Sequence, residues 1–389
     1  MKFPISLALL LGALTATGVA ATPEPIHIDV ILSQTGTASF LGQGETTALK
    51  ILQGVVNGKG GINGRPVQFD IGDDQSTPTQ AVQLMNSIQS HKPGALLGTG
   101  FTATCLAILP LAARGNGPAT YCMTPGVHPA SGSYGFSASI GTESMVPVML
   151  RFFKEKGWKR FAFMNSTDAS GQDVLEAMTR TLKLPEFKSM NLVAEEHFNT
   201  SDISVNAQIT RIKAANPQAA IFWTAGTGFG TVLRNAHDAG FDVPIIGGNA
   251  NELYAQLQQY KGFLPTELYF PSPRSIAEGG TLPGPIHDAQ TTYFKAFKAA
   301  NLRPDISSTM AWDPALILLD AYRHLGADAS GEKVRDYILH LHGWVGINGV
   351  YDFGDGSQRG IGENACVMLR YDGAKTEFIT ASRPAGRLK

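Results

Sequence analysis

Short apolar segments alternate with longer amphipathic segments from residue 26 onward. The short runs predict strands, and the segments between them repeat apolar positions every three or four residues, as helices do. The first strands are expected at 27–32, 67–71, 95–97 and 119–123, and the first helices at 45–56, 79–89 and 104–113. Alternation of this kind builds βαβ units, so it predicts a parallel sheet.

A second series of the same kind follows a Gly- and Ser-rich stretch at residues 130–142. Its helices are expected at 145–156, 172–182, 204–215 and 230–239, and its strands at 160–164, 190–195, 219–224 and 243–246. After strand 267–270 the chain is irregular up to residue 285, and helices are then expected at 287–300, 310–325 and 331–342. Segments 350–353 and 365–371 alternate as antiparallel strands do. The pattern therefore predicts two similar α/β halves.

The first 21 residues have the features of a cleaved signal peptide. Lys2 precedes an apolar run of about ten residues, which is too short for a bilayer that needs roughly 20. Val19-Ala20-Ala21 then supplies small residues at the cleavage position, and no Cys lies nearby for a lipid anchor. We therefore expect secretion to the periplasm without direct insertion into the membrane.

Composition narrows the class of protein. A chain of 389 residues with 43% hydrophobic residues can bury a core in each of two domains. A net charge of −1, without a cluster of Lys and Arg, argues against nucleic acid as a partner. The three cysteines, Cys105, Cys122 and Cys366, cannot form a disulfide framework. A Cys105–Cys122 bridge and three buried thiols both fit the sequence.

A segment near the start of the chain carries a family resemblance. Residues 57–67 read Asn-Gly-Lys-Gly-Gly-Ile-Asn-Gly-Arg-Pro-Val, and Asp73 and Asp74 follow the next strand. This is a helix stopped by glycines, a tight turn, and a carboxylate pair at a strand end. In that order it resembles the first βαβ unit of the periplasmic binding proteins for branched-chain amino acids. Residues 32–36 and 246–249 match the same family, so the resemblance extends over nearly the whole mature chain.

The resemblance implies a type I periplasmic binding fold, in which two Rossmann-like α/β lobes with parallel sheets are joined by a three-segment hinge. Its crossings are expected near 139–143, 269–272 and 346–350. Lobe 1 would comprise residues 26–140 and 271–346, lobe 2 residues 141–270 and 347–381, and residues 382–389 a C-terminal tail. The implied function is the solute-binding subunit of an ATP-driven importer, with the membrane permease of an ATP-binding cassette importer as partner.

Candidate ligand-binding residues of the first lobe follow two strand ends, where ligands of open α/β sheets bind. Residues 98–104, Gly-Thr-Gly-Phe-Thr-Ala-Thr, match the family segment that holds a solute carboxylate, with Thr102 as the contacting hydroxyl. Thr102 or Thr104 could instead cap the helix. In the next loop, members of the family contact the ligand through the backbone carbonyl at the position of Gly126. They commonly have Thr where this chain has His128, and this histidine could pair with an acidic ligand or be structural. No Asp or Glu lies between Gln75 and Thr142 to repel a carboxylate.

The second lobe departs from the pattern of the amino-acid binders. They place aromatic residues where this chain has Ser170 and Ala225, and an acidic group against the ligand ammonium where it has Asn249. Unless Asp168 replaces that charge, a buried ammonium would be unpaired at a cost of several kcal/mol. We therefore expect a small carboxylate without an amino group, and the lost aromatics leave room for an aromatic or branched acid. Further residues expected near the cleft are Phe40, Leu41 and Phe101, whereas Phe229 fits ordinary core packing better.

Enzyme functions find little support in the sequence. The loop 98–103 satisfies the dinucleotide pattern G-x-G-x-x-A, but no acidic residue follows at about 20 positions to hold a ribose. His340 and His342 lie at an expected helix end without an evident metal partner, so neither a cofactor nor a metal is expected. The alternatives left open are a binder of a branched-chain or other amino acid, or of an amide, and more remotely a sensory receptor module of the same fold.

Overall fold

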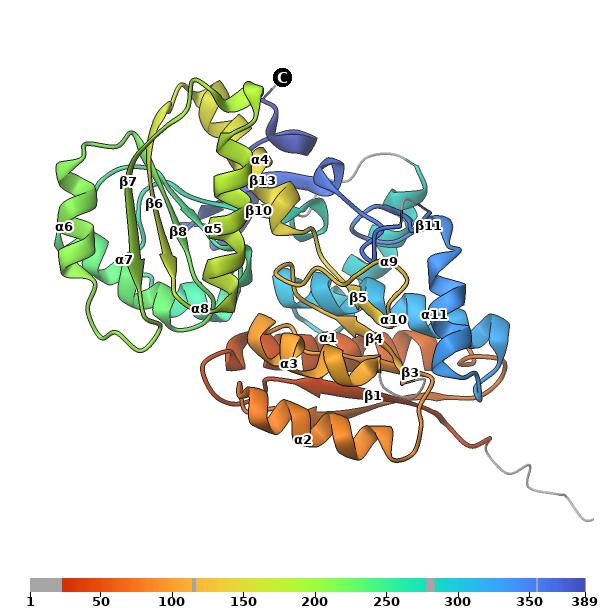
Figure 1. The fold of residues 1–389 in the computed structure, drawn as a ribbon. Helices are drawn as coiled ribbons and strands as arrows, with labels where there is room; N and C mark the ends of the chain where they lie inside the picture. The colour runs from red at the N-terminus through yellow and green to blue at the C-terminus, as the bar shows by residue number, and fades with distance from the viewer. Residues whose placement is uncertain (1–22, 114–116, 278–283, 355, 389) are drawn as a thin grey trace, which may run out of the picture.

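The computed structural model describes residues 23–113, 117–277, 284–354 and 356–388. The expected signal peptide, residues 1–21, lies outside these ranges. Within the described ranges, every helix is too short or too polar to cross a membrane. The chain forms two α/β units, one from each series of strands and helices (Figure 1).

Among the described residues, the first unit has a five-stranded parallel sheet in the order β2-β1-β3-β4-β5. Its strands are β1 (Ile26–Leu32), β2 (Val67–Asp73), β3 (Ala95–Leu97), β4 (Ala119–Cys122) and β5 (Gly135–Ser137). The helices between them are α1 (Ser39–Gly58), α2 (Pro78–Gln89) and α3 (Thr102–Ala112). Alternate residues of β1 are buried on opposite faces: Val30 packs with Leu49 of α1, and Ile31 packs with Met85 of α2. Both faces of the sheet are therefore covered, as an apolar parallel sheet requires.

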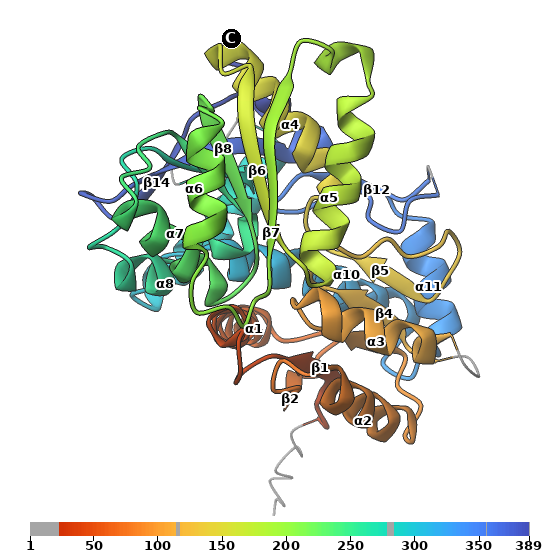
Figure 2. The same ribbon diagram turned by 60° about the vertical axis from the view of Figure 1, so that its left-hand side comes forward.

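The second unit, as far as it is described, has a seven-stranded sheet in the order β14-β13-β10-β9-β8-β6-β7. Its parallel strands are β6 (Arg160–Ser166), β7 (Asn191–Phe198), β8 (Ala219–Trp223), β9 (Ile245–Gly247) and β10 (Leu268–Pro273). Next to β10, β13 (Cys366–Asp372) pairs antiparallel with it, and β14 (Glu377–Thr380) pairs antiparallel with β13 at the edge of the sheet. The helices of this unit are α4 (Thr142–Lys156), α5 (Ala169–Leu182), α6 (Asn206–Ala214), α7 (Gly228–Asp238) and α8 (Tyr254–Gln259). Helices α4 and α5 pack together, as do α6 and α7 (Figure 2).

The chain then returns to the first unit. Helices α9 (Pro285–Ala299), α10 (Ile306–Leu325) and α11 (Gly331–Leu339) follow, and α9 and α10 pack against α1. The expected helix 331–342 is too long: α11 ends at Leu339, because His340, with φ −101° and ψ 7°, already leaves the α-helical conformation. His342 instead opens the hairpin of β11 (His342–Val345) and β12 (Val350–Asp352), where its ring lies 2.8 Å from Asp352.

Three segments of the described chain connect the two units. The first, residues 138–141, lies between β5 and α4 and overlaps the expected crossing at 139–143. The second follows β10, because the expected crossing at 269–272 falls inside that strand. The third lies near residues 360–365 rather than at 346–350, because Phe353 packs edge to face against Phe136 and the Gln358 carbonyl accepts a hydrogen bond from the Ser137 N–H, both in the first unit. With these shifts, the boundaries of the two lobes remain a proposal.

A disulfide joins Cys105 of α3 to Cys122 at the end of β4, with 6.0 Å between their Cα atoms. The thiol of Cys366 is buried in β13. Of the two arrangements that the sequence left open, the structure has the bridge. It braces the start of α3, which carries candidate site residues.

Candidate functional site

The carboxyl ends of the strands in both sheets meet at a narrow cleft between the two units. Its first wall is the loop after β3 and the loop after β4, and its second wall is the start of α5 and the ends of β8 and β9. The described lining residues are Gly100, Phe101, Thr102, Thr124, Pro125, Ser170, Trp223, Thr224, Ala225, Gly248, Asn249 and Ala250. The space left for a water-sized sphere is about 10 Å³, roughly the room of one water molecule. The walls are thus closed on one another.

Larger hollows exist elsewhere on the molecule. One of about 640 Å³ is lined by His27 and Asp29 of β1 and by Gly94, which precedes β3. These residues lie at or near the amino ends of the strands, whereas the ligands of open α/β sheets bind beyond the carboxyl ends. The small interlobe cleft is therefore the better candidate site.

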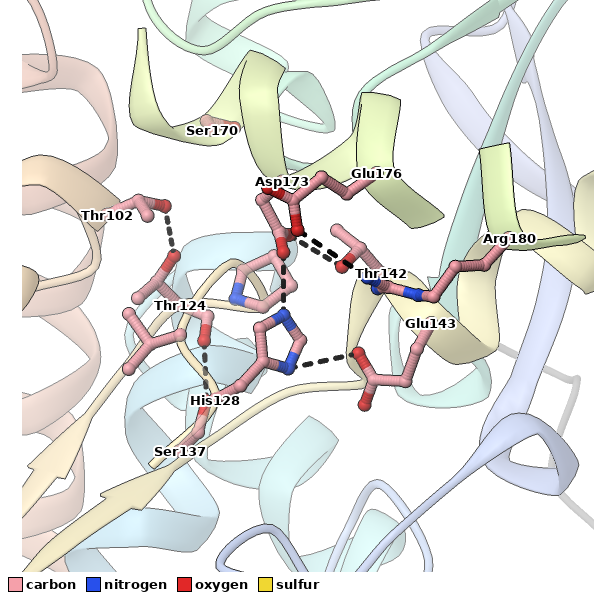
Figure 3. A network of polar contacts seen from close by, with 12 residues as sticks. Thr102, Thr124, His128, Ser137, Thr142, Glu143, Ser170, Asp173, Glu176 and Arg180 are labelled. Carbon is pink, nitrogen blue, oxygen red and sulfur yellow. Dashed lines mark hydrogen bonds and ion pairs between the residues drawn. The ribbon is translucent and has the colours of Figure 1, made fainter. Parts of the chain in front are cut away.

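Thr102 and Thr104 have different roles in the loop that begins α3. The Thr102 hydroxyl lies 2.8 Å from the Thr124 hydroxyl in the cleft wall, and Thr102 is 4% exposed (Figure 3). The Thr104 hydroxyl donates to the Thr99 hydroxyl at 2.9 Å and is 3.0 Å from the Phe101 carbonyl. Thr104 therefore holds the loop together and is not among the described lining residues, while Thr102 stays the candidate for a ligand contact.

A buried carboxyl group lies directly behind this loop. Glu45 of α1 is 1% exposed, and a Cβ atom on Gly100 would stand 2.0 Å from its Oε1. Burial raises the pKa of Glu45 well above its usual value, the charge of Asp74 adds to the rise, and the Gly100 N–H opposes it. The sequence argument from the acid-free stretch 75–142 missed Glu45, because this residue comes from another helix. The sequence feature that could have revealed Glu45 is an acidic residue within the apolar stripe that Leu41, Leu49 and Leu52 form on α1.

The second wall contains an aromatic side chain that the sequence interpretation missed. Trp223, at the end of β8, donates from its indole nitrogen to the Ser170 hydroxyl at 3.3 Å. Ser170 lies in the first turn of α5, and Asp168 caps that helix by accepting from the Gly171 N–H and the Ser166 hydroxyl, both at 2.9 Å. The carboxylate of Asp168, which the sequence left open as a counter-charge, thus serves the helix cap, and Asp168 is not among the described lining residues.

Asn249 brings an unsatisfied donor to the cleft. It is 1% exposed, and its Nδ2 has no hydrogen-bond partner among the described residues. The neighbouring Asn251 differs, because its Nδ2 donates to the carbonyls of Thr224 at 2.6 Å and Gly248 at 3.1 Å. A buried donor without a partner costs about 1–3 kcal/mol, so an acceptor oxygen from a ligand would be stabilised there.

Two other candidates lie beside the cleft rather than in its lining. The His128 Nε2 is 2.6 Å from Asp173 of α5, so the acid that pairs with this histidine belongs to the protein (Figure 3). Gly126 lies between the two walls, because a Cβ atom there would be 3.0 Å from the Thr102 side chain and 3.3 Å from Asp173. The expected ligand contact of His128 is thus replaced by a contact between the lobes.

Phe40 and Leu41 do not belong to the described lining of the cleft. Leu41 is buried in the apolar core of the first unit, and Phe40 packs against that core. Phe229 is fully buried in the core, as expected. Whether Phe40 and Leu41 face the cleft or the core depends on the direction of the side chains at the start of α1, which the sequence pattern does not give.

The electrostatic character of the cleft comes from helix ends rather than ionised groups. None of the described lining residues is charged. Helices α3 and α5 both begin at the cleft, and helix N-termini favour negative groups. In the described ranges, no group of three or more His, Cys, Asp or Glu is placed to hold a metal ion. Once its walls separate, the site would favour a small ligand that carries acceptor oxygens.

Comparisons with known proteins match the fold along nearly all of the chain. A family model described as "Periplasmic binding protein" matches residues 25–375. Leu/Ile/Val-binding protein BraC3 of Rhizobium johnstonii is 25% identical, over 61% of this chain and 67% of the relative. A leucine-, isoleucine-, valine-, threonine- and alanine-binding protein of Pseudomonas aeruginosa is 24% identical, over 62% of this chain and 65% of the relative, so the matched region leaves about a third of these relatives uncovered.

Solved structures agree with this architecture. An extracellular ligand-binding receptor from Rhodopseudomonas palustris HaA2 superposes with a TM-score of 0.79 at 20% identity, over 92% of this chain and 100% of that chain. A substrate-binding protein from Streptococcus pneumoniae in complex with isoleucine gives 0.76 at 17% identity, over 92% and 100% of the two chains. A solute-binding protein from R. palustris in complex with benzoate gives 0.73 at 16% identity, over 93% and 96%. The expected two-lobed α/β fold is confirmed.

Proposed function

The chain belongs to the periplasmic binding protein family, and on this basis we propose that it captures a small carboxylate without an amino group for an ATP-driven importer. The favoured ligands are aromatic or branched organic acids. The ligand would bind between the lobes, and its preferential affinity for the closed form would shift the population toward closure. The closed protein would then be presented in the periplasm to a membrane permease of an ATP-binding cassette importer.

The observation that carries this proposal is the uncharged cleft with an unpartnered Asn249 Nδ2. An ammonium group buried there would have no carboxylate to pair with, which costs several kcal/mol. A ligand carboxylate would find the Asn249 amide, the hydroxyls of Thr102 and Thr124, and the N–H groups at the start of α3. The donors therefore favour an anion over an amino acid.

The shape of the ligand is suggested by the apolar parts of the lining. Trp223 on one wall and Phe101 on the other would enclose a planar or branched group. Among the structural neighbours, one holds isoleucine and another holds benzoate. Both ligands carry a carboxylate on an apolar body, which is the feature that we assign to the ligand of this chain.

A branched-chain amino acid is the second candidate, because the curated relatives are named for leucine, isoleucine and valine. Backbone carbonyls at the cleft would then have to replace the missing counter-charge. The uncharged Asn249 makes this candidate the weaker one.

Calorimetric titration of the purified mature protein with benzoate, 4-methyl-2-oxopentanoate, leucine and isoleucine tests the proposal. The two acids should bind more tightly than the two amino acids. Thr102→Ala should weaken acid binding by roughly ten- to a hundredfold, because a hydrogen bond to a charged group contributes about 1.5–3 kcal/mol, and Thr102→Ser is the matched control that keeps the hydroxyl. Asn249→Asp should weaken acid binding and improve amino-acid binding. Submicromolar binding of leucine without any binding of the acids would refute the proposal.

A further inference from the structure

We infer that His128 and Asp173 form a positioning pair that holds the two lobes closed in the ligand-free protein. The inference rests on the proposed function only in that closure is what captures the ligand. His128 lies in the loop after β4, in the first unit, and Asp173 lies in α5, in the second. Their side chains meet across the boundary, with 2.6 Å between Nε2 and Oδ1 (Figure 3).

Both partners are held by further contacts on the side of the second unit. Thr142, the first residue of α4, donates its hydroxyl to the other oxygen of Asp173 at 2.6 Å. Glu143 places Oε2 3.3 Å from the His128 Nδ1. One carboxylate oxygen of Asp173 is therefore bound by His128 of the first unit, and the other is bound by Thr142 of the second unit. The His128 ring lies between the carboxylates of Asp173 and Glu143. The side chain of Asp173 is 10% exposed and that of His128 is 42% exposed, so solvent screens the pair only in part.

The loop that carries His128 cannot follow Asp173 when the lobes separate. Arg359 donates to the carbonyls on both sides of Gly126, those of Pro125 at 3.0 Å and Val127 at 2.8 Å. The same guanidinium donates to the carbonyls of residues 138 and 139 in the first connection, at 3.2 and 3.0 Å. This anchor fixes the loop to the first unit and to the hinge. Opening must therefore break the bond between His128 and Asp173.

The pair lies next to the cleft but outside its described lining. Gly126 separates it from Thr102, since a Cβ atom on Gly126 would be within 3.3 Å of both Thr102 and Asp173. The pair can therefore stabilise the closed form without contacting the ligand. Residues with this role change how long the lobes stay closed, and hence the release rate of any ligand, because release requires opening.

Single-molecule fluorescence transfer on the ligand-free mature protein tests the inference. Dyes would be attached to cysteines introduced at the exposed Lys50 of α1 and Lys183 after α5, because Cys366 is buried and the other cysteines form the disulfide. His128→Ala and Asp173→Ala should each lower the closed-to-open ratio about three- to tenfold, as expected for a partly screened charged hydrogen bond. The double variant should lower it no further.

The matched control is His91→Ala. His91 also pairs with a carboxylate, with 3.0 Å between its Nε2 and Asp29, but both residues belong to the first unit. This variant should leave the closed-to-open ratio unchanged. A purely structural role for His128 would instead lower the melting temperature and leave the ratio as it is. An unchanged ratio in His128→Ala, additive effects of the two substitutions, or a wild type that is never closed would overturn the inference. Because the readout needs no ligand, its failure is distinct from failure of the ligand proposal.

Discussion

A methyl group added at Gly100 would test whether the candidate site depends on the buried carboxyl behind it. The new Cβ would stand 2.0 Å from Oε1 and 2.8 Å from Cδ of Glu45. Gly100 does not have a positive φ, so alanine adds no backbone strain of its own. Glu45 is 1% exposed and lies on the apolar face of α1, which leaves its carboxyl little room to move. Overpacking of this kind typically costs about 1–3 kcal/mol, and we expect Gly100→Ala to lose stability in that range.

Urea unfolding at pH 7 measures the loss, as a lower midpoint with an unchanged slope. The matched control is Gly54→Ala on α1, the helix that carries Glu45. No described atom outside the neighbouring helix backbone lies within 4 Å of the new Cβ at this position. It should gain about 0.5–1 kcal/mol, because alanine is the better helix former. Combining Gly100→Ala with Glu45→Ala removes the clash, so the double variant should recover stability relative to the sum of the two single changes. Strict additivity, or a Gly100→Ala protein as stable as the wild type, would refute the reasoning.

Three further predictions follow from buried groups. Replacing Cys105 and Cys122 by Ser should cost about 3 kcal/mol, because the bridge closes a loop with a sequence separation of 17; identical melting of the oxidised and reduced wild type would contradict this. Burial raises the pKa of Asp313 from 3.8 to about 6, so the folded chain keeps a proton that the unfolded chain releases. The contribution of Asp313 to stability should therefore fall by about 2 kcal/mol from pH 4 to pH 6, and Asp313→Asn should remove this part of the slope in urea titrations across that range. Arg359→Met leaves four backbone carbonyls without their donor and should cost at least about 3 kcal/mol. Arg359→Lys should recover only part of that in thermal unfolding, because an ammonium lacks the guanidinium fork.

Strands and long helices were predictable because their apolar periods are local properties of the chain. Most elements of both series occur within a few residues of where the sequence predicts them, but α1 begins at Ser39 rather than at residue 45, and the short helix α8 was not predicted. Strand β5 was missed because Gly135–Ser137 is short and lies in a Gly- and Ser-rich stretch that has no period. The third connection was misplaced because the packing of Phe353 on Phe136 is a tertiary contact.

The candidate site was also predictable where the local pattern places a residue and not where a tertiary contact does. Several predicted residues line the cleft because the strand ends and helix starts of this architecture face it, and they include Thr102, Ser170, Ala225 and Asn249. His128 and Asp168 are each engaged by a protein group that sequence spacing does not reveal, and their contact with a ligand stays a prediction. Trp223 was missed because an aromatic residue at a strand end has the same pattern whether it faces the core or the cleft.

The disulfide between α3 and β4 also bears on how the chain finds its correct pairing. Three cysteines allow three different single bridges, and two of these would tie Cys366 of the second unit to the first. Chain order favours the native one, because both of its residues are synthesised well before strand β13, and domains generally fold from the N-terminus as they are made. Once formed, the bridge resists exchange, since exchange needs a thiolate to reach a disulfide sulfur and all three cysteines are fully buried. Scrambling would require both units to unfold together.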